Sequence, residues 1–290
     1  MIKFTKYYLV FLLISIILII GSFFCIYNYG LKLGIDFTGG SIIELEYENQ
    51  IPLHSEIKEV LGNLEQVSIQ SIGEKGILLR TIAISENTHQ EILNNLREMD
   101  YVFLEQRFES IGPIIGQELR EKTIRVVFWA LLLMILYISF AFRKVRKPLN
   151  SWQYGLISVF ALFHDIIIPL GILAYLRIEM SIPIITALLA VVGYSINNTV
   201  VVFDRIRENL VNPEFGFNEI IDRSLNQTLS RQINTSLTTL FVVAGIFFFG
   251  GETLKYFALA LMIGIIAGTY SSIFLVSSLL TQNIDNKLKK

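Results

Sequence analysis

The chain has 290 residues, of which 53% are hydrophobic and only 17% are charged, and its mean hydropathy is positive. This composition is too apolar for an ordinary soluble domain, and 24 basic against 25 acidic residues give no sign of a nucleic-acid partner. Because Cys25 is the single cysteine, an intramolecular disulfide and a multi-cysteine metal site are both excluded.

Six stretches are long and apolar enough to cross a membrane as helices, since the hydrocarbon core of a bilayer requires about 20 residues of helix. In chain order they are Tyr7 to Tyr27, Ile124 to Phe142, Trp152 to Leu176, Ile182 to Phe203, Ile233 to Phe249 and Tyr256 to Leu280. The sequence therefore predicts a polytopic α-helical membrane protein with six transmembrane helices.

The first stretch is interpreted as an uncleaved membrane anchor. A cleaved signal and a lipoprotein attachment at Cys25 are the alternatives, but Phe23 and Phe24 stand where a signal peptidase needs small residues.

Basic residues gather at alternate ends of the six stretches. These ends carry Lys3 and Lys6, then Arg143, Lys144, Arg146 and Lys147, then Arg205, Arg207 and Arg223, and finally Lys287, Lys289 and Lys290. The positive-inside rule makes these ends cytoplasmic, so both termini are predicted to lie in the cytoplasm. The predicted parts are residues 1–33, a polar insert at 34–123 and a five-helix region at 124–290.

The polar insert, residues 34–123, is predicted to form an extracytoplasmic α+β domain. Residues 41–48 (SIIELEYE) alternate apolar and acidic side chains, which is typical of a half-buried strand. A helical stretch near Ile57 to Leu64 follows, then strands at Gln66 to Ile72 and Ile77 to Ile84, a helix at Asn87 to Met99 and a strand at Val102 to Phe108. This β-α-β-β-α-β order predicts a ferredoxin-like fold, with two helices on one face of an antiparallel sheet.

A second polar connection, Asp204 to about Arg231, is predicted to be cytoplasmic. It contains Asn212-Pro213, a helix stop. Beyond this point an apolar stripe predicts an amphipathic helix that lies at the membrane surface or packs on the protein, and it consists of Ile220, Ile221, Leu225 and Leu229.

Two ionisable residues, His164 and Asp165, lie near the middle of the third apolar stretch. Consecutive side chains on a helix diverge by about 100°, so we expect each to need its own partner or cavity. Hydrogen bonds between helices and a role in proton transfer are both compatible with such residues.

Further polar residues interrupt the fourth and fifth stretches. Asn197 and Asn198 lie in the cytoplasmic third of the fourth, where hydrogen bonds between helices are the simplest interpretation. The strictly apolar part of the fifth, Leu240 to Phe249, is too short to cross a bilayer, so the preceding polar segment must enter the membrane and bring Arg231 with it. Arg231 then either snorkels to the boundary or lies beside a proton path.

The last stretch carries Gly264 and Gly268, four residues apart. This spacing permits close approach of two helices, either within the chain or with another membrane subunit.

Several of these segments together resemble one family. They are LGIDFTGG, IGPIIGQEL, FHD, GYSINNTVVVFDRIREN, TLSRQINTSLTTL, FGG and GIIAGTYSSIF, and they occur in this order over nearly the whole chain. They resemble SecF, a family of protein-export membrane subunits that work with SecD. The family motif residues are Gly34, Asp36, Gly39, Gly40, Asp204 and Arg205.

The resemblance implies half of a resistance-nodulation-division type transporter in the bacterial inner membrane. SecD supplies the other half, and the complex associates with the Sec channel and uses proton-motive force to promote export of unfolded polypeptides. No enzymatic activity, cofactor or metal ion is expected, and the partners are SecD, the channel, the exported chains and membrane lipids.

One position departs from the family pattern. The second residue of the asparagine pair is often aspartate in the family, a candidate proton carrier, whereas Asn198 cannot titrate. The resemblance then assigns a proton pathway to Arg231, Asn198, Asn197, Asp165 and His164, with the asparagines beside Arg231. The titrating carboxylate is expected on SecD or, second, at Asp165, unless coupling has been lost and the subunit is mainly structural.

Two other classes of protein are alternatives to this interpretation. A homodimer of the six-helix unit could act alone as a proton-coupled exporter of small molecules or lipids. An intramembrane enzyme is disfavoured because the sequence has no HExxH metal pattern, nucleotide-binding loop or credible nucleophile pair.

Overall fold

The computed structural model describes residues 1–48, 51–62, 67–73, 75–99, 101–141, 151–211 and 215–288. The chain forms two compact units. The first, called the helical unit, comprises Met1–Lys32 and Val127–Lys290, and the second, called the lobe, comprises Leu33–Val126.

The lobe is built on a four-stranded sheet in the order β2-β3-β1-β4, in which all neighbouring strands are antiparallel. Its elements are α2 (Ile35–Thr38), β1 (Gly40–Tyr47), α3 (His54–Leu61), β2 (Ser68–Ile72), β3 (Gly76–Thr81), α4 (Glu86–Arg97) and β4 (Phe103–Ile111). From β1 onward, the order of strands and helices is the predicted one, although Gln66 lies outside the described residues.

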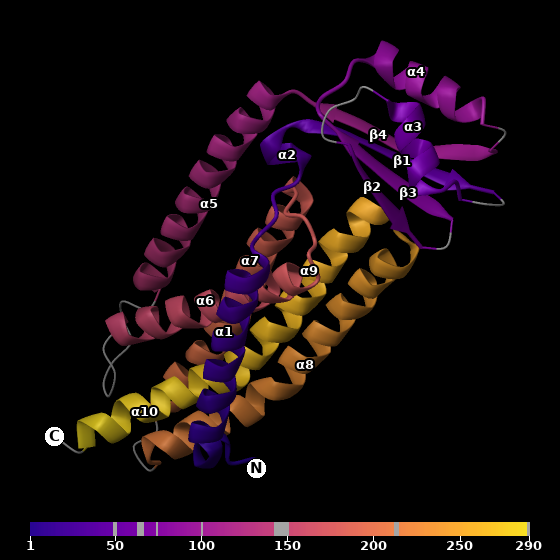
Figure 1. The fold of residues 1–290 in the computed structure, drawn as a ribbon. Coiled ribbons are helices and arrows are strands. Elements are labelled where there is room, and N and C mark those ends of the chain that lie inside the picture. The colour runs from indigo at the N-terminus through magenta and orange to yellow at the C-terminus, as the bar shows by residue number, and fades with distance from the viewer. Residues whose placement is uncertain are drawn as a thin grey trace. The chain divides into compact units, whose positions relative to one another are not determined.

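The core of the lobe lies between the sheet and helices α3 and α4, which Figure 1 shows on one face of the sheet. Ile43, Leu45 and Tyr47 are alternate residues of β1, so their side chains point to the same face and are buried there. Ile57 of α3 and Leu93 of α4 close the core from the other side. The alternation read from the sequence therefore predicted the buried face correctly.

Tyr47 brings a polar atom into this core. Its side chain is only 1% exposed, and its hydroxyl has no hydrogen-bond partner among the described residues. Burial, and then the nearby Tyr101, raise the pKa of Tyr47 to about 12. The folded-state pKa exceeds the ordinary value of about 10, so the folded lobe favours the neutral form of Tyr47. The resulting contribution to the free energy of unfolding is complete below about pH 10 and is lost as the pH rises toward 12.

Replacing Tyr47 by phenylalanine should raise the free energy of unfolding of the lobe by about 1 kcal/mol, because an unsatisfied buried hydroxyl is removed without a loss of packing. The loss of stability above about pH 10 should also become smaller. Pulse proteolysis of the full chain in urea, at mildly and strongly alkaline pH, measures both effects. Tyr101→Phe is the control, since it removes a hydroxyl that donates to Glu56 at 3.2 Å and should destabilise the lobe. Destabilisation by Tyr47→Phe would mean that its hydroxyl is satisfied.

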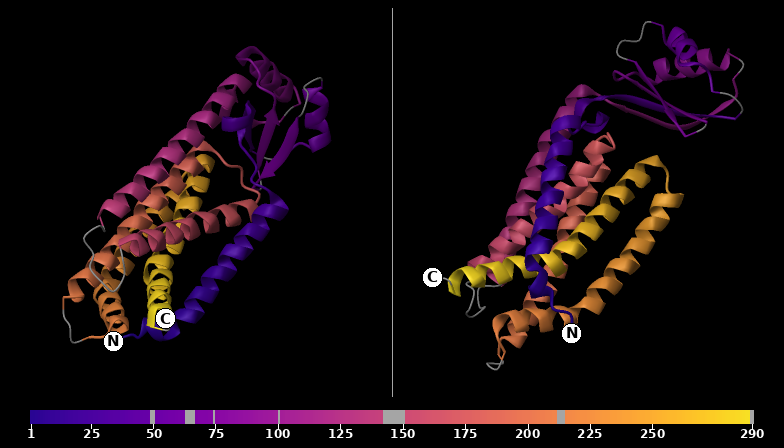
Figure 2. Two further views of the ribbon diagram at one scale, coloured as in Figure 1. Left: turned by 90° about the vertical axis from the view of Figure 1, so that its left-hand side faces the viewer. Right: turned by 60° about the horizontal axis from the view of Figure 1, so that its bottom comes forward.

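The helical unit consists of long helices, most of them packed side by side (Figure 2). They are η1 (Phe4–Tyr7), α1 (Tyr8–Tyr29), α6 (Ser151–Tyr175), α7 (Ile182–Asn209), α8 (Phe217–Phe249), α9 (Glu252–Tyr270), η2 (Ser271–Leu275) and α10 (Val276–Leu288). Helix α5 (Pro113–Ala141) continues across the boundary between the two units.

Within the described part of the chain, five helical stretches are long and apolar enough to cross a membrane. They are Phe4–Tyr29, Gln153–Tyr175, Ile182–Asn209, Phe217–Phe249 and Leu254–Gln282, and each overlaps a predicted span. The predicted span Ile124 to Phe142 falls on the second half of α5, and its last residue lies outside the described part of the chain.

The connection predicted from Asp204 to about Arg231 is mostly helical. Helix α7 continues to Asn209 and α8 begins at Phe217, so the non-helical part is short. The predicted stop at 212–213 lies outside the described residues, as do the basic residues 143–147 and 289–290.

The apolar stripe at the start of α8 packs on the protein. Ile220, Ile221 and Leu225 are buried in the core of the helical unit together with Phe203 and Ile206 of α7. Of the two interpretations left open by the sequence, the packed helix is therefore correct. The helix can extend through this region because its apolar face gains burial as it does so.

The N-terminal segment is held against α8. The amide and the hydroxyl of Thr5 donate to the two carboxylate oxygens of Asp222 at 2.9 Å each, and the amide of Ile2 donates to Asn226 at 2.9 Å. Phe4 is 4% exposed and belongs to the core. These contacts explain why a carboxylate sits on the buried side of α8.

The glycine pair of α9 serves packing within the chain. A Cβ on Gly264 would lie 2.2 Å from a methyl carbon of Val191, and one on Gly268 would lie 3.2 Å from Cβ of Ser195. Both neighbours belong to α7. The close approach allowed by the small residues therefore joins α9 to α7.

Candidate functional site

A buried polar cluster lies between α6, α7 and η2, around Asp165 and His164. Both side chains are 0% exposed. The Asp165 carboxylate accepts hydrogen bonds from the hydroxyls of Ser195 on α7 and Ser271 on η2, the latter at 2.7 Å. Its other oxygen lies 2.8 Å from Nδ1 of His164. Two hydroxyl donors and one imidazole nitrogen therefore surround the carboxylate inside the helical unit.

Asp165 has partners of its own in Ser195 and Ser271, as expected, but the two side chains also bind each other, which was not expected. Their Cα–Cβ directions diverge, but rotation about the side-chain bonds brings the imidazole and the carboxylate together. Nε2 of His164 has no hydrogen-bond partner in the described part of the chain. Among the described residues, no three histidine, cysteine or carboxylate side chains gather closely enough to hold a metal ion.

Four consecutive residues, the last two of α9 and the first two of η2, connect this cluster to the neighbouring helices. Their side chains reach three different helices: Thr269 contacts Ser236 of α8, Tyr270 donates to the carbonyl of Phe11 in α1, Ser271 donates to Asp165 of α6, and Ser272 donates to Gln232 of α8. The backbone changes at Ser271 from α-helix to a single turn of π-helix. Such turns are rare and occur frequently at functional sites.

The two adjacent asparagines point in different directions. Asn198 is 3% exposed, and its amide nitrogen has no hydrogen-bond partner among the described residues. Asn197 is exposed on the surface of the helical unit. The hydrogen bonds between helices that the sequence suggested for this pair are therefore absent from the described chain.

On α8 it is Gln232, and not Arg231, that faces the interior. Gln232 is 2% exposed and is bonded to Ser272 at 2.9 Å, whereas Arg231 is exposed and its guanidinium has no partner among the described residues. No hydrogen bond joins Arg231 to Asn198. The sequence carried a signal for Gln232, since Thr228, Gln232 and Ser236 recur every four residues and therefore share one helix face.

The motif glycines of the lobe lie at a sharp turn. Gly34 precedes α2, and its carbonyl accepts the amides of Phe37 and Thr38, while Asp36 lies within that short helix. Gly39 and Gly40 have φ of +74° and +129°, conformations that other residues rarely adopt. A Cβ on Gly39 would lie only 2.7 Å from Cα of Pro113. The glycine pair is therefore a structural requirement at the start of β1.

Asp204 and Arg205 lie near the end of α7 and form surface interactions. Asp204 pairs with Arg207 at 3.2 Å, and Arg205 bonds to Glu208 at 2.5 Å and to Gln227 of α8 at 2.7 Å. Arg205 thus links the C-terminal end of α7 to α8. Such exposed ion pairs contribute little to stability, typically up to about 1 kcal/mol.

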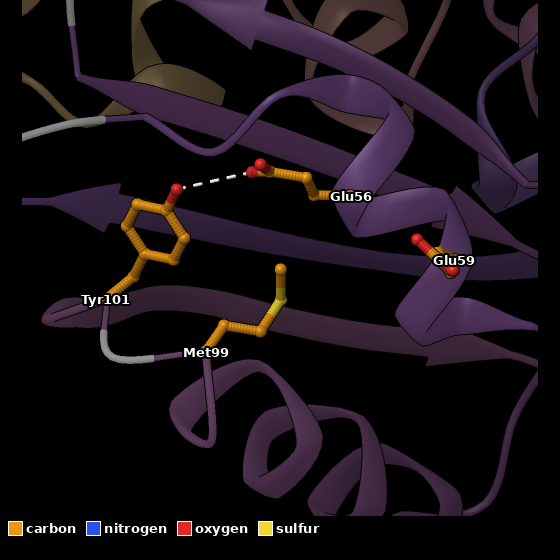
Figure 3. A pocket seen from close by; sticks show the side chains of 4 residues that line it. All are labelled: Glu56, Glu59, Met99 and Tyr101. Atoms are coloured by element: carbon orange, nitrogen blue, oxygen red, sulfur yellow. Dashed lines mark hydrogen bonds between the residues drawn. The ribbon is translucent and has the colours of Figure 1, made fainter.

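An open pocket of about 410 Å³ lies on the lobe and is lined by Glu56, Glu59, Met99 and Tyr101 (Figure 3). The Tyr101 hydroxyl donates to the Glu56 carboxylate, and partial burial together with this carboxylate raises the pKa of Tyr101. The two carboxylates make this pocket acidic.

Comparison with known protein families shows to which family the chain is related. Residues 91–286 match the family described as protein export membrane protein SecD/SecF, C-terminal, and residues 26–51 match the SecD/SecF GG motif. The chain belongs to the SecF family. The second match contains Gly39 and Gly40, so the turn described above is the feature for which this motif is named.

Individual SecF proteins match over nearly their whole length. The protein translocase subunit SecF of Thermobaculum terrenum is 37% identical over 97% of this chain and 93% of its own length. That of Desulfurispirillum indicum is 41% identical over 96% of this chain and 91% of its own length.

Solved structures of SecDF agree with the fold. The crystal structure of SecDF from Thermus thermophilus, described as a translocon-associated membrane protein, aligns with a TM-score of 0.85 and 33% identity over 98% of this chain. SecDF in its super-membrane-facing form aligns with a TM-score of 0.71. The chain spans 39% of each SecDF protein, so a SecDF chain contains much more than its SecF-like part.

Proposed function

We propose that the chain is an accessory subunit of the Sec protein translocase, which acts with a SecD-like subunit and uses proton-motive force to promote polypeptide export. The observation that carries this proposal is the match to SecF proteins over more than nine-tenths of both chains. The buried ionisable pair inside an apolar helix supports the coupling to protons, because such groups are costly in a membrane and mark ion pathways.

The proposed membrane topology has six spans, with the second half of α5 as the sixth. Five apolar helices leave the termini on opposite sides, whereas six return the chain to its starting side, in agreement with the basic residues near both termini. The lobe, bounded at about residues 34–123, then lies outside the cytoplasm. Its strand order and its β-α-β-β-α-β sequence support assignment as a ferredoxin-like domain.

The SecD-like subunit is proposed to cover the polar outer face of α7 and α8. Asn197 and Arg231 are exposed on helices that are otherwise apolar enough to span a membrane, as are Asn234, Thr235 and Thr238. The hydroxyls of Thr235 and Thr238 donate to carbonyls of their own helix, but lipid tails cannot satisfy the side chains of Asn197, Arg231 and Asn234. A partner helix with a carboxylate could pair with Arg231. The fusion of SecD and SecF in one SecDF protein supports this partner.

The proposed proton pathway comprises Arg231, Asn198, Asn197, Asp165 and His164. Arg231 and Asn197 would face the partner, whereas Asp165 and His164 lie inside the helical unit. The Sec channel, exported polypeptides and membrane lipids are the other proposed partners, and the role is non-enzymatic and needs no cofactor.

Copurification tests the proposed function. The tagged chain, solubilised from its native membrane, should retain a SecD-like subunit, and vesicles containing the pair should export a precursor faster with proton-motive force than with an uncoupler. A homodimer without such a partner, active in efflux of small molecules, would contradict the proposal and favour a stand-alone exporter.

Replacing Asn198 by aspartate tests whether its site is hydrated. The amide nitrogen makes no hydrogen bond that aspartate would remove, so the variant should assemble normally and retain at least about half of the export activity. Assembly is measured by copurification and activity by vesicle export. Asn198→Leu is the matched control for size. If the aspartate variant fails to assemble whereas the leucine variant does assemble, then Asn198 is packed against other side chains without water.

A further inference from the structure

The hydroxyl of Ser271 has two acceptors within reach. It donates to Asp165 of α6 at 2.7 Å, and the carbonyl of Gly268 in its own helix lies 3.2 Å away. The first acceptor links η2 to α6, whereas the second lies within the segment itself. The choice between them depends on whether Asp165 is an acceptor only, as a carboxylate is, or also a donor, as a carboxylic acid is.

We propose that the Asp165–His164 pair binds the coupling proton. The Ser271 hydroxyl then changes its hydrogen-bond acceptor, from the Asp165 carboxylate to the Gly268 carbonyl, when the pair gains that proton. When Asp165 is ionised, Ser195, Ser271 and His164 all donate to it. When a proton forms an O–H bond with the carboxylate, that group donates to one hydroxyl, and Ser271 turns to the Gly268 carbonyl. The inference rests on the proposed function and assigns its proton to a particular site.

The electrostatic surroundings favour this site. The contacts from α7 and η2 are neutral hydroxyls, and the other titratable group nearby is Tyr270, whose ring stacks on that of His164 at 5.9 Å. Among the described residues, no lysine, arginine or second carboxylate bonds to Asp165. Asp165 is 0% exposed and has no cationic residue of fixed charge beside it among the described residues, and a buried charge without such a partner is costly.

A chain of side-chain contacts leads from the pair to the surface of the helical unit, so a change in hydrogen bonding at the pair can alter the position of exposed residues. The two neighbours of Ser271 in the chain bond to other helices. Tyr270 donates to a carbonyl of α1, and Ser272 donates to Gln232 of α8. Gln232 is next to Arg231, the exposed cation on the proposed SecD-facing side. The π-helical turn supplies a place where the backbone can change its hydrogen bonding without unfolding the helix.

The proton site is tested by infrared spectroscopy of the full chain with its SecD-like partner in lipid vesicles. The carbonyl stretch of a protonated carboxyl group should grow as the pH falls and should be lost in Asp165→Asn. Ser271→Ala should move the midpoint of this band to higher pH, because the ionised form loses one donor, and Ser271→Thr should restore it. Ser277→Ala is the matched control, since this buried hydroxyl of α10 donates to the carbonyls of Ile273 and Phe274 and makes no contact with Asp165.

Export assays on the same vesicles separate this inference from the proposed function. Loss of stimulation by proton-motive force in Asp165→Asn supports the inference, whereas an unchanged band or normal stimulation in that variant overturns it. If Asp165→Asn does not assemble, equal midpoints for the Ser271→Ala and Ser277→Ala variants overturn it instead. If the wild-type pair shows the band but no stimulated export, the proposed function fails while the proton site stands.

Discussion

Replacing Arg231 by leucine should strongly reduce the stimulation of export by proton-motive force while leaving the complex assembled. The guanidinium has no partner within the described chain, so its removal breaks no internal contact of the helical unit. If it pairs with a carboxylate of the SecD-like subunit, the loss of a charged hydrogen bond worth about 1.5–3 kcal/mol should reduce stimulated export roughly ten- to hundredfold.

The measurement is export of a precursor into vesicles, with and without an uncoupler, together with copurification of the partner. Arg231→Lys should preserve part of the activity because it keeps the charge. Arg223→Leu is a matched control on the same helix, since Arg223 pairs with Glu219 and stacks on Phe215, and it should have little effect on coupling. Normal stimulated export in Arg231→Leu would remove this residue from the mechanism.

Replacing Gly39 by alanine should destabilise the lobe by roughly 2–4 kcal/mol. Its φ of +74° with ψ of 168° belongs to a region that is essentially restricted to glycine. The added methyl group would also lie 2.7 Å from the backbone of Pro113, which cannot move away as a flexible side chain could. Pulse proteolysis of the full chain in urea measures the free energy of unfolding of the lobe.

Gly73→Ala is the matched control for this prediction. Gly73 also has a positive φ, +59°, but a Cβ there meets nothing within 4 Å, so only the backbone cost of about 1 kcal/mol is expected. Equal effects of the two substitutions would show that the contact with Pro113 is unimportant. A tolerated Gly39→Ala would show that the motif is an ordinary turn.

The order of elements in the lobe could be read from the sequence because it depends on local patterns. The alternation of SIIELEYE placed Ile43, Leu45 and Tyr47 on one face before any neighbour was known. Of the six apolar stretches read from the sequence, five coincide with described helices that are long and apolar enough to cross a membrane. The glycine spacing of α9 predicted close packing but left the partner helix open, and the structure identified α7.

The arrangement of polar side chains in the helical unit depended on tertiary structure. The sequence drew attention to Asp165, Asn198 and Arg231 because polar residues are unusual in apolar stretches. It did not reveal that Asp165 binds Ser271, which is 106 positions away, or that Gln232 rather than Arg231 faces inward.

Composition and periodicity thus determined that this is a membrane protein with a small α+β lobe, since burial of apolar surface acts on every residue and leaves a regular pattern. Only the packing of the helices decided which polar groups meet. A hydrogen bond requires two atoms within about 3 Å, and that distance is set by the rotation and crossing of helices far apart in the chain.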